Sequence, residues 1–165
     1  MSGSFADSYL GKLRQIIGER PVLMPGARII AENAAGEILL IKRGDFNLWG
    51  WPAGSAEMGQ SISDTARAEL YEETGLTAHQ VTPVGFASDP VHDRIEYPHG
   101  DVLFAFAMIF HVTEWSGELR ADGHESLDVR FFPQDRLPED RTPPVSRTLA
   151  ALQRYKASGG QFQMI

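Results

Sequence analysis

The chain has 165 residues, a formal net charge of −7 at pH 7 and no cysteine. The length favours one domain with a real core, and the lack of cysteine excludes disulfides, thiolate catalysis and cysteine-ligated zinc. The acidic balance argues against a dedicated nucleic-acid binder, and there is neither a signal peptide nor an apolar run long enough to cross a membrane, so we expect a cytoplasmic protein with no membrane partner.

Residues 8–17 predict a short amphipathic helix ahead of the core. Its apolar residues recur at helical spacing: Leu10, Leu13, Ile16 and Ile17. Gly18 follows the helix, and Pro21 and Pro25 then favour an extended connection. The helix can pack on its own domain or on the second subunit of a homodimer, and the sequence leaves both open.

Residues 27–32 and 38–42 predict two strands joined by a turn. Lys42 and Arg43 end the second strand just ahead of a long loop, where each is a candidate for binding a phosphate. A solvated strand end is the alternative for both. Trp49 in the following loop is a candidate for stacking on a base, although packing in the core is the more common role.

Residues 61–74 predict a helix with recognisable ends. Ser61 and Asp64 have the spacing of a capping box, which places the start of the helix at Ser61. Gly75 can end the helix in the left-handed conformation that favours glycine.

Three carboxylates share one side of this helix. Glu69, Glu72 and Glu73 fall on an arc about 100° wide, beside an apolar stripe that contains Leu70. Their mutual repulsion and their place near the negative end of the helix dipole are both unfavourable. A hard divalent cation such as Mg²⁺ or Mn²⁺ would reverse both effects, whereas a solvated acidic face is the alternative.

The stretch from Trp49 to Leu76 resembles the Nudix box. The family pattern is glycine, five residues, Glu, seven residues, Arg-Glu, an aliphatic residue, any residue, Glu-Glu, any residue, glycine and an aliphatic residue. Seven of its nine defined positions match: Gly54, Glu69, Leu70, Glu72, Glu73, Gly75 and Leu76. Gln60 and Ala68 stand where the family has Glu and Arg, so the box is degenerate and both members of a charged pair are absent together.

The resemblance implies an α/β fold, an α/β/α sandwich around a mixed β-sheet. It implies hydrolysis of a diphosphate bond in a nucleoside diphosphate linked to another moiety, with Mg²⁺ or Mn²⁺ as cofactor. The substrate would be a nucleotide sugar, an ADP-ribose-like compound or a nucleoside triphosphate. The implied metal ligands are Glu69, Glu72, Glu73 and the carbonyl of Ala53. The alternative is a catalytically weak Nudix domain that acts as a nucleotide-binding sensor or scaffold, which Gln60 and Ala68 favour.

Later segments complete the expected core. Residues 81–87 and 101–113 predict strands, separated by a polar loop at 88–100 that we expect to lie over the substrate. Residues 129–132 predict a further strand and residues 143–155 a closing helix. The inward-facing residues of that helix are Val145, Leu149 and Leu152.

Glu125 precedes the strand at 129–132 in a stretch that resembles the C-terminal part of Nudix domains. The resemblance implies that Glu125 reaches the metal or activates water, and that Glu69, Glu72 or Glu125 is the general base. An exposed loop carboxylate is the alternative for Glu125. We expect one Nudix domain over residues 1–165, with a helical extension at 1–20, a core at 21–157 and a tail at 158–165.

Overall fold

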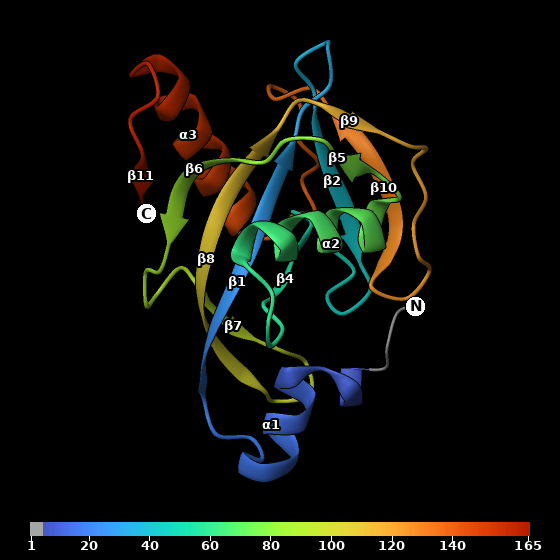
Figure 1. Ribbon diagram of the computed structural model, residues 1–165, viewed down its shortest axis with the longest axis vertical. Coiled ribbons are helices and arrows are strands. Elements are labelled where there is room, and N and C mark those ends of the chain that lie inside the picture. Colours follow the sequence, from blue (N-terminus) through green and yellow to red (C-terminus); the bar gives the residue numbers. More distant parts are fainter. Residues whose placement is uncertain (1–4) are drawn as a thin grey trace.

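Two long strands, β1 (Val22–Ala31) and β8 (Val102–Val112), run parallel through the centre of the molecule (Figure 1). The computed structural model describes residues 5–165. In its larger sheet the strand order is β11-β6-β8-β1-β4, with β7 also paired to β8. The sheet is mixed, because β1 and β8 are parallel whereas β6 is antiparallel to β8 and β4 is antiparallel to β1.

The other strands are shorter than the central pair. They are β2 (Ile38–Arg43), β3 (Trp49–Gly50), β4 (Ala53–Ser55), β5 (Thr77–Ala78), β6 (Thr82–Ala87), β7 (Arg94–Glu96), β9 (Trp115–Ser116), β10 (Ser126–Phe132) and β11 (Gln163–Met164). The order β10-β2-β3 makes a second, antiparallel sheet, and β5 pairs with β9.

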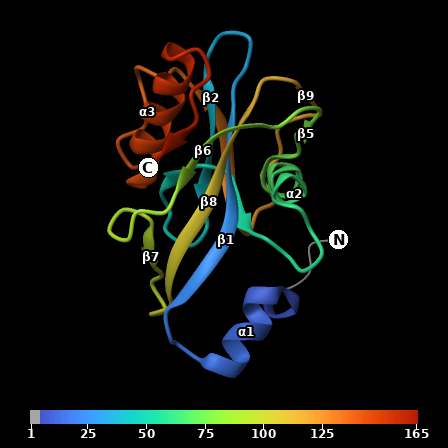
Figure 2. The same ribbon diagram turned by 60° about the vertical axis from the view of Figure 1, so that its left-hand side comes forward.

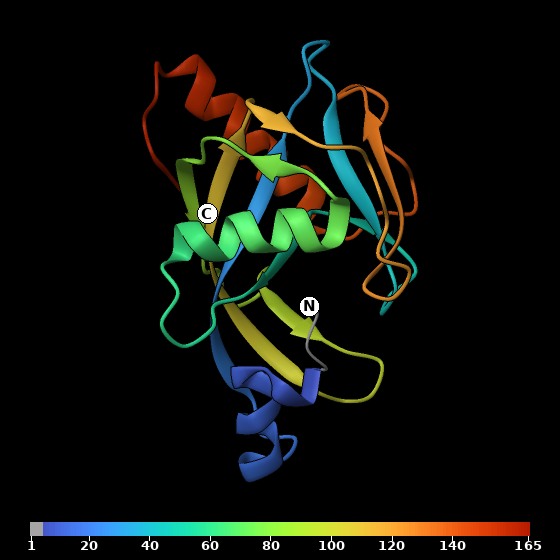
Figure 3. The same ribbon diagram turned by 45° about the vertical axis from the view of Figure 1, so that its right-hand side comes forward.

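Helices cover both faces of the larger sheet. The helical elements are η1 (Phe5–Asp7), α1 (Tyr9–Ile17), α2 (Ile62–Thr74) and α3 (Pro144–Ala157). Figure 2 shows α2 and α3 on opposite sides of β1 and β8, and Figure 3 shows α2 lying across the strands. The structure therefore has the α/β/α layering that the sequence predicts.

Adjacent residues of one strand supply the two cores. Ile29 packs with Leu70 of α2, whereas Ile30 packs with Leu149 of α3. Both isoleucines and Leu70 are fully buried. Successive side chains on a strand point to opposite faces, so a strand covered on both sides must be apolar at consecutive positions. This explains why buried apolar residues stand at consecutive positions, such as Ile29 and Ile30 of β1 and residues 38–41 of β2.

Strands β1 and β2 diverge after a single bridge between Glu32 and Ile38, and each joins a different sheet. Strand β1 also begins five residues before the predicted start and includes Pro25. The carbonyl oxygen of Pro25 accepts a hydrogen bond of 3.0 Å from the backbone N–H of Ala56, just past the end of β4. The proline therefore lies at the end of this pairing, where a missing N–H is tolerated.

Two segments that the sequence analysis left without regular structure contain strands. The polar loop at 88–100 contains β7, which folds back on β8 with Arg94 opposite Phe104. The tail contains β11, which pairs with β6 in parallel, Gln163 opposite Gly85. Both strands lack strong alternation, so only the pairing partner reveals them. Among residues 5–165, no helix has the length and apolarity needed to span a bilayer.

Candidate functional site

Helix α2 has the ends that its sequence predicts. The side chain of Ser61 accepts a hydrogen bond from the backbone N–H of Asp64, and Gly75 ends the helix with φ +78°. A Cβ atom on Gly75 would lie 2.6 Å from the carbonyl oxygen of Glu118. The glycine is therefore required both by the left-handed backbone and by the close approach of a second chain segment.

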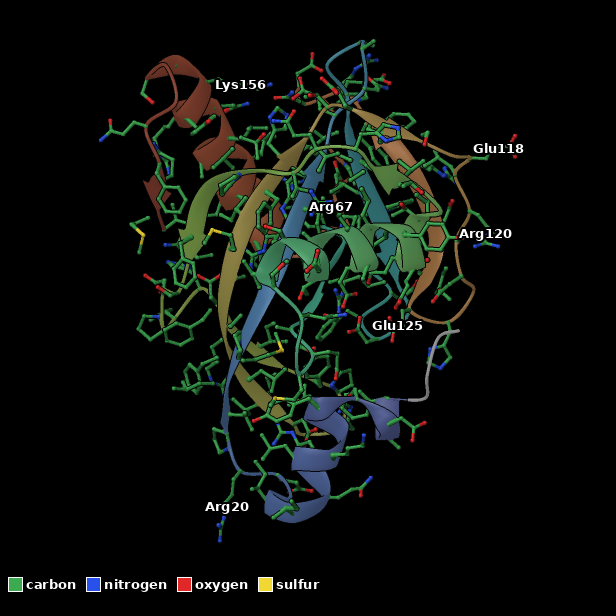
Figure 4. All side chains as sticks on the ribbon, in the orientation of Figure 1. Arg20, Arg67, Glu118, Arg120, Glu125 and Lys156 are labelled. Atoms are coloured by element: carbon green, nitrogen blue, oxygen red, sulfur yellow. The ribbon has the colours of Figure 1, made fainter. Side chains whose placement is uncertain are left out.

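Three carboxylates converge beside α2. Glu69 and Glu73 of the helix and Glu125 from the loop before β10 place carboxylate oxygens within 4.8 Å of one another. Glu73 is only 3% exposed, and its Oε2 accepts a hydrogen bond of 2.9 Å from the backbone N–H of Ala53. In Figure 4, Glu125 lies below α2, on the side that faces η1 and α1.

The surroundings oppose ionisation of these groups. Burial, with Glu125 and Glu72 close by, raises the pKa of Glu69 to about 8. Burial and the charge of Glu69 raise the pKa of Glu73 well above its ordinary value, and burial together with Asp122 raises the pKa of Glu125. Clustered carboxyl groups that resist ionisation need either protons or a cation, and oxygen donors suit a hard divalent ion. The donor set thus fits Mg²⁺ or Mn²⁺.

The loop that carries Glu125 is tied directly to α2. Ser126 is fully buried, and its Oγ donates a hydrogen bond of 2.6 Å to the carbonyl oxygen of Glu73. Asp122 accepts hydrogen bonds from the backbone N–H groups of His124 and Ser126 and so shapes the turn. This connection brings Glu125 to the helix although the two are far apart in the sequence.

Gly54 leaves the space that Glu69 occupies. A Cβ atom at Gly54 would lie 2.0 Å from Oε1 of Glu69, far inside van der Waals contact. We expect Gly54→Ala to displace the Glu69 carboxylate, to lower activity by at least about tenfold and to destabilise the fold by about 1–3 kcal/mol. Steady-state kinetics and thermal melts would measure both effects.

The matched control for this change is Gly159→Ala. Gly159 has φ +74°, and a Cβ atom there would meet nothing within 4 Å. That substitution strains the backbone without touching the carboxylates, so it should cost stability and leave kcat unchanged. Equal activity losses in the two variants would contradict the role assigned to Gly54.

The three carboxylates line a cavity of about 750 Å³. Arg43, Ala53 and Glu72 also line it, as the sequence analysis expects of site residues. The guanidinium of Arg43 binds Asp45 through Nε at 3.0 Å and Nη2 at 2.6 Å. Glu72 lies on the exposed face of α2 and outside the group of three converging carboxylates.

The structure does not bring Lys42 and Trp49 into this cavity. Lys42 pairs with Asp140, and Trp49 is 7% exposed and packs edge-on against Phe132 with ring centroids 4.8 Å apart. Lys42 and Arg43 are neighbours on β2, so their side chains leave the strand on opposite faces. Trp49 therefore has the packing role that the sequence analysis names as the more common one.

Arg28 is a site residue that the sequence analysis missed. It lines the cavity at 6% exposure, donating from Nη2 to Asp93 at 3.1 Å and from Nη1 to Thr148 at 2.9 Å. Burial lowers the pKa of Arg28, and the charge of Asp93 partly offsets that effect. An arginine inside the apolar run of β1 was the available signal, because a buried charge needs a partner.

The loop at 88–100 reaches the cavity only in part. Tyr97 lines it and stacks between Phe46 and His99, with ring centroids 5.5 and 5.4 Å away. Asp93, by contrast, is buried beneath the loop against Arg28. The loop therefore supplies aromatic side chains to the lining of the cavity, and its Asp93 forms an ion pair with Arg28 of β1.

Uncharged residues occupy the two positions at which the box departs from the family pattern, Gln60 and Ala68. Oε1 of Gln60 accepts hydrogen bonds from Oγ1 of Thr65 at 3.2 Å and from the backbone N–H of Glu57 at 3.3 Å. Ala68 is half-buried on α2. These contacts connect the box loop to the helix without a buried ion pair.

Comparisons with known proteins identify a family and similar folds for this chain. A family model described as the NUDIX domain matches residues 22–153. The chain is 32% identical over 124 residues to a putative 8-oxo-dGTP diphosphatase of Bacillus subtilis, covering 75% of this chain and 76% of that protein. It is 33% identical over 109 residues to an ADP-ribose pyrophosphatase of Methanocaldococcus jannaschii, covering 62% of this chain and 58% of that protein.

Among solved structures, a MutT NUDIX hydrolase from Burkholderia pseudomallei superposes with a TM-score of 0.67 at 23% identity, covering 81% of this chain and 99% of that one. This likeness concerns the fold, while the family model and the Bacillus relative extend it to sequence. With the box glutamates gathered around one cavity on that fold, the chain belongs to the Nudix family of pyrophosphohydrolases.

Proposed function

We propose that the protein hydrolyses a diphosphate bond in a nucleoside diphosphate linked to another moiety and requires Mg²⁺ or Mn²⁺. The observation that carries this proposal is the convergence of Glu69, Glu73 and Glu125 on one cavity that Arg43 also lines. Carboxylates that are held close together repel one another, and a divalent cation bound between them would remove that repulsion.

Glu69, Glu73 and Glu125 would hold the cation, with the carbonyl of Ala53 as a further ligand. A bound divalent ion would offset the negative charge of the diphosphate and lower the pKa of a bound water. Glu73 is held in place by the N–H of Ala53, so its carboxylate is fixed before substrate arrives.

Arg43 is the group that would bind a phosphate oxygen. Its Nε and Nη2 donate hydrogen bonds to Asp45, which holds the planar guanidinium in one orientation. Asp45 does not use Nη1, so Nη1 is the nitrogen that would donate to the phosphate. Glu72 is exposed at the edge of the cavity and is one candidate general base. Glu69 and Glu125 are the other two.

The names of two relatives support two of the three substrate classes. One is named a putative 8-oxo-dGTP diphosphatase and the other an ADP-ribose pyrophosphatase. We therefore propose nucleoside triphosphates and ADP-ribose-like compounds, with nucleotide sugars as the third class. The second candidate function is a nucleotide-binding sensor or scaffold, which the neutral residues Gln60 and Ala68 favour.

The test is turnover of a diphosphate panel with Mg²⁺ or Mn²⁺, with products separated by chromatography. Release of a nucleoside monophosphate from at least one substrate, abolished by EDTA, is the expected result. Absence of turnover with intact nucleotide binding would overturn the hydrolase in favour of the sensor.

A further inference from the structure

The N-terminal segment forms one wall of the cavity that holds the three carboxylates. In Figure 1, η1 and α1 lie below α2, beside the lower ends of β1 and β8. Ser8, Leu10 and Arg14 from this segment line the cavity. Of the two packing modes that the sequence left open, the structure shows the helix packing on its own domain.

The first anchor of this wall comes from the box loop. The backbone N–H of Tyr9 donates to both carboxylate oxygens of Glu57, at 3.0 and 2.9 Å. Ser8 caps the same helix end by accepting a hydrogen bond of 3.0 Å from Gly11. A carboxylate is favourable at the positive end of a helix dipole, so Glu57 ties α1 to the loop that precedes α2.

The second anchor is Arg14, whose side chain is 8% exposed. Its Nη1 donates to the carbonyl oxygens of Gly18 at 3.1 Å and Arg20 at 2.6 Å, and its Nη2 donates to Val102 at 3.0 Å. Its Nε lies 3.2 Å from Oδ2 of Asp101 but forms no hydrogen bond with it. Arg14 thus fixes α1 to the start of β8, and its charge is balanced by Asp101.

The part of the cavity beside this wall, called the chamber below, is lined by apolar and acidic side chains. The apolar residues of its lining include Leu10, Met24, Leu103 and Ala105. Its lining also includes the carboxylates of Asp7, Glu57 and Asp101. The basic side chains near them are Arg14 and His99, and both lie against Asp101, at 3.2 and 3.3 Å. The chamber therefore offers hydrogen-bond acceptors and negative potential, which suit an uncharged group with N–H or O–H donors and oppose an anion.

We propose that the η1–α1 wall determines specificity, admitting an uncharged, donor-bearing group attached to the diphosphate and rejecting an anionic one. This inference rests on the proposed function. The diphosphate would lie at the carboxylate end of the cavity beside Arg43, and the selected group would extend toward α1. Glu57, Arg14 and Asp101 are positioning residues, because they hold the wall in place.

The first test uses substrate pairs that differ by one anionic group: UDP-glucose with UDP-glucuronate, and NADH with NADPH. At low ionic strength the protein should prefer the neutral member of at least one pair by about tenfold in kcat/KM. Asp7→Lys should reduce that preference by at least about threefold, because it replaces a repelling charge with an attracting one. The matched control, Asp135→Lys, changes an 84% exposed side chain outside the cavity lining.

The second test releases the wall. Glu57→Ala and Arg14→Ala should raise KM for the preferred neutral substrate by about tenfold and change kcat by less than about threefold, since the three carboxylates stay in place. Ile16→Ala on the outer face of α1, where the side chain is 84% exposed, should change neither constant. Circular dichroism melts would show whether each variant remains folded.

Binding of the same pairs, measured by calorimetry with Ca²⁺, separates the two possible failures. One outcome would overturn the role of the wall alone: the protein turns over or binds the substrates, and its preference for the neutral member is the same in Asp7→Lys as in Asp135→Lys. Absence of both turnover and binding would overturn the proposed function and the wall with it.

Discussion

Glu73→Gln is expected to lower kcat by at least about 100-fold while the protein remains folded. Glu73 is 3% exposed and shares the carboxylate cluster with Glu69 and Glu125. Glutamine keeps the size of the side chain and an oxygen for the N–H of Ala53, but it removes the charge that would hold a divalent cation. Loss of residues that merely orient metal ligands typically costs about 10–100-fold, so loss of a direct ligand should cost more.

The measurement is steady-state turnover of the best substrate of the panel at saturating Mg²⁺, with metal affinity determined separately by Mn²⁺ titration. Glu118→Gln is the matched control, because Glu118 is exposed and Figure 4 shows it projecting away from α2. It should retain full activity. A Glu73→Gln protein with nearly unchanged kcat would refute the assignment of Glu73 as a ligand.

The metal-free protein is expected to lose stability as the pH rises from 7 to 8.5. The folded-state pKa of Glu69 is about 8, and the pKa of Glu73 is also raised far above its ordinary value. Over this window the folded protein therefore binds more protons than the unfolded chain, so raising the pH favours unfolding. We expect a decrease of about 1–3 kcal/mol, or roughly 3–10 °C in Tm.

At lower pH, His111 has the opposite effect on the stability of the fold, so the test begins at pH 7. Burial lowers the pKa of His111, and that effect makes stability rise with pH up to about the ordinary histidine value of 6.5. Above pH 7 the glutamates dominate the comparison. Thermal melts in EDTA across the window, repeated with Glu73→Gln, would isolate their contribution, because the variant should show a smaller decrease.

Mg²⁺ or Mn²⁺ should restore the lost stability, and more so at pH 8.5 than at pH 7. A ligand that binds only the folded state stabilises it, and binding here displaces the protons that the carboxyl groups otherwise hold. Melts at both pH values with and without cation measure this difference. A Tm that is independent of cation at pH 8.5 would count against a metal site in this cluster.

The two ends of α2 and the spacing of Glu69 and Glu73 could be predicted from sequence, because capping and helical periodicity are local. The buried face of α3 was equally accessible: Val145, Leu149 and Leu152 are at most 5% exposed, as their spacing predicts. In these segments each residue's partner lies within a turn or two of the same helix.

Other features depended on pairing between distant segments. Strand β11 exists because the tail reaches the free edge of β6, and β7 exists because the chain folds back on β8. Neither strand has enough apolar alternation to be recognised alone. The choice between Lys42 and Arg43 likewise required the orientation of β2, since neighbouring positions on a strand face opposite sides.

The sequence by itself determined the α2 carboxylates and the family resemblance, because both rest on local spacing. The layered fold is what that resemblance implies, and apolar residues at consecutive positions of the strands agree with it. Only the tertiary structure decided that the carboxylate of Glu125, which the resemblance names, lies within 4.8 Å of those of Glu69 and Glu73, that Arg28 is buried in the lining of the same cavity and that α1 forms one wall of it. Those contacts form between segments brought together by packing, so local spacing fixes neither the distance from Glu125 to α2 nor the position of α1 at the cavity.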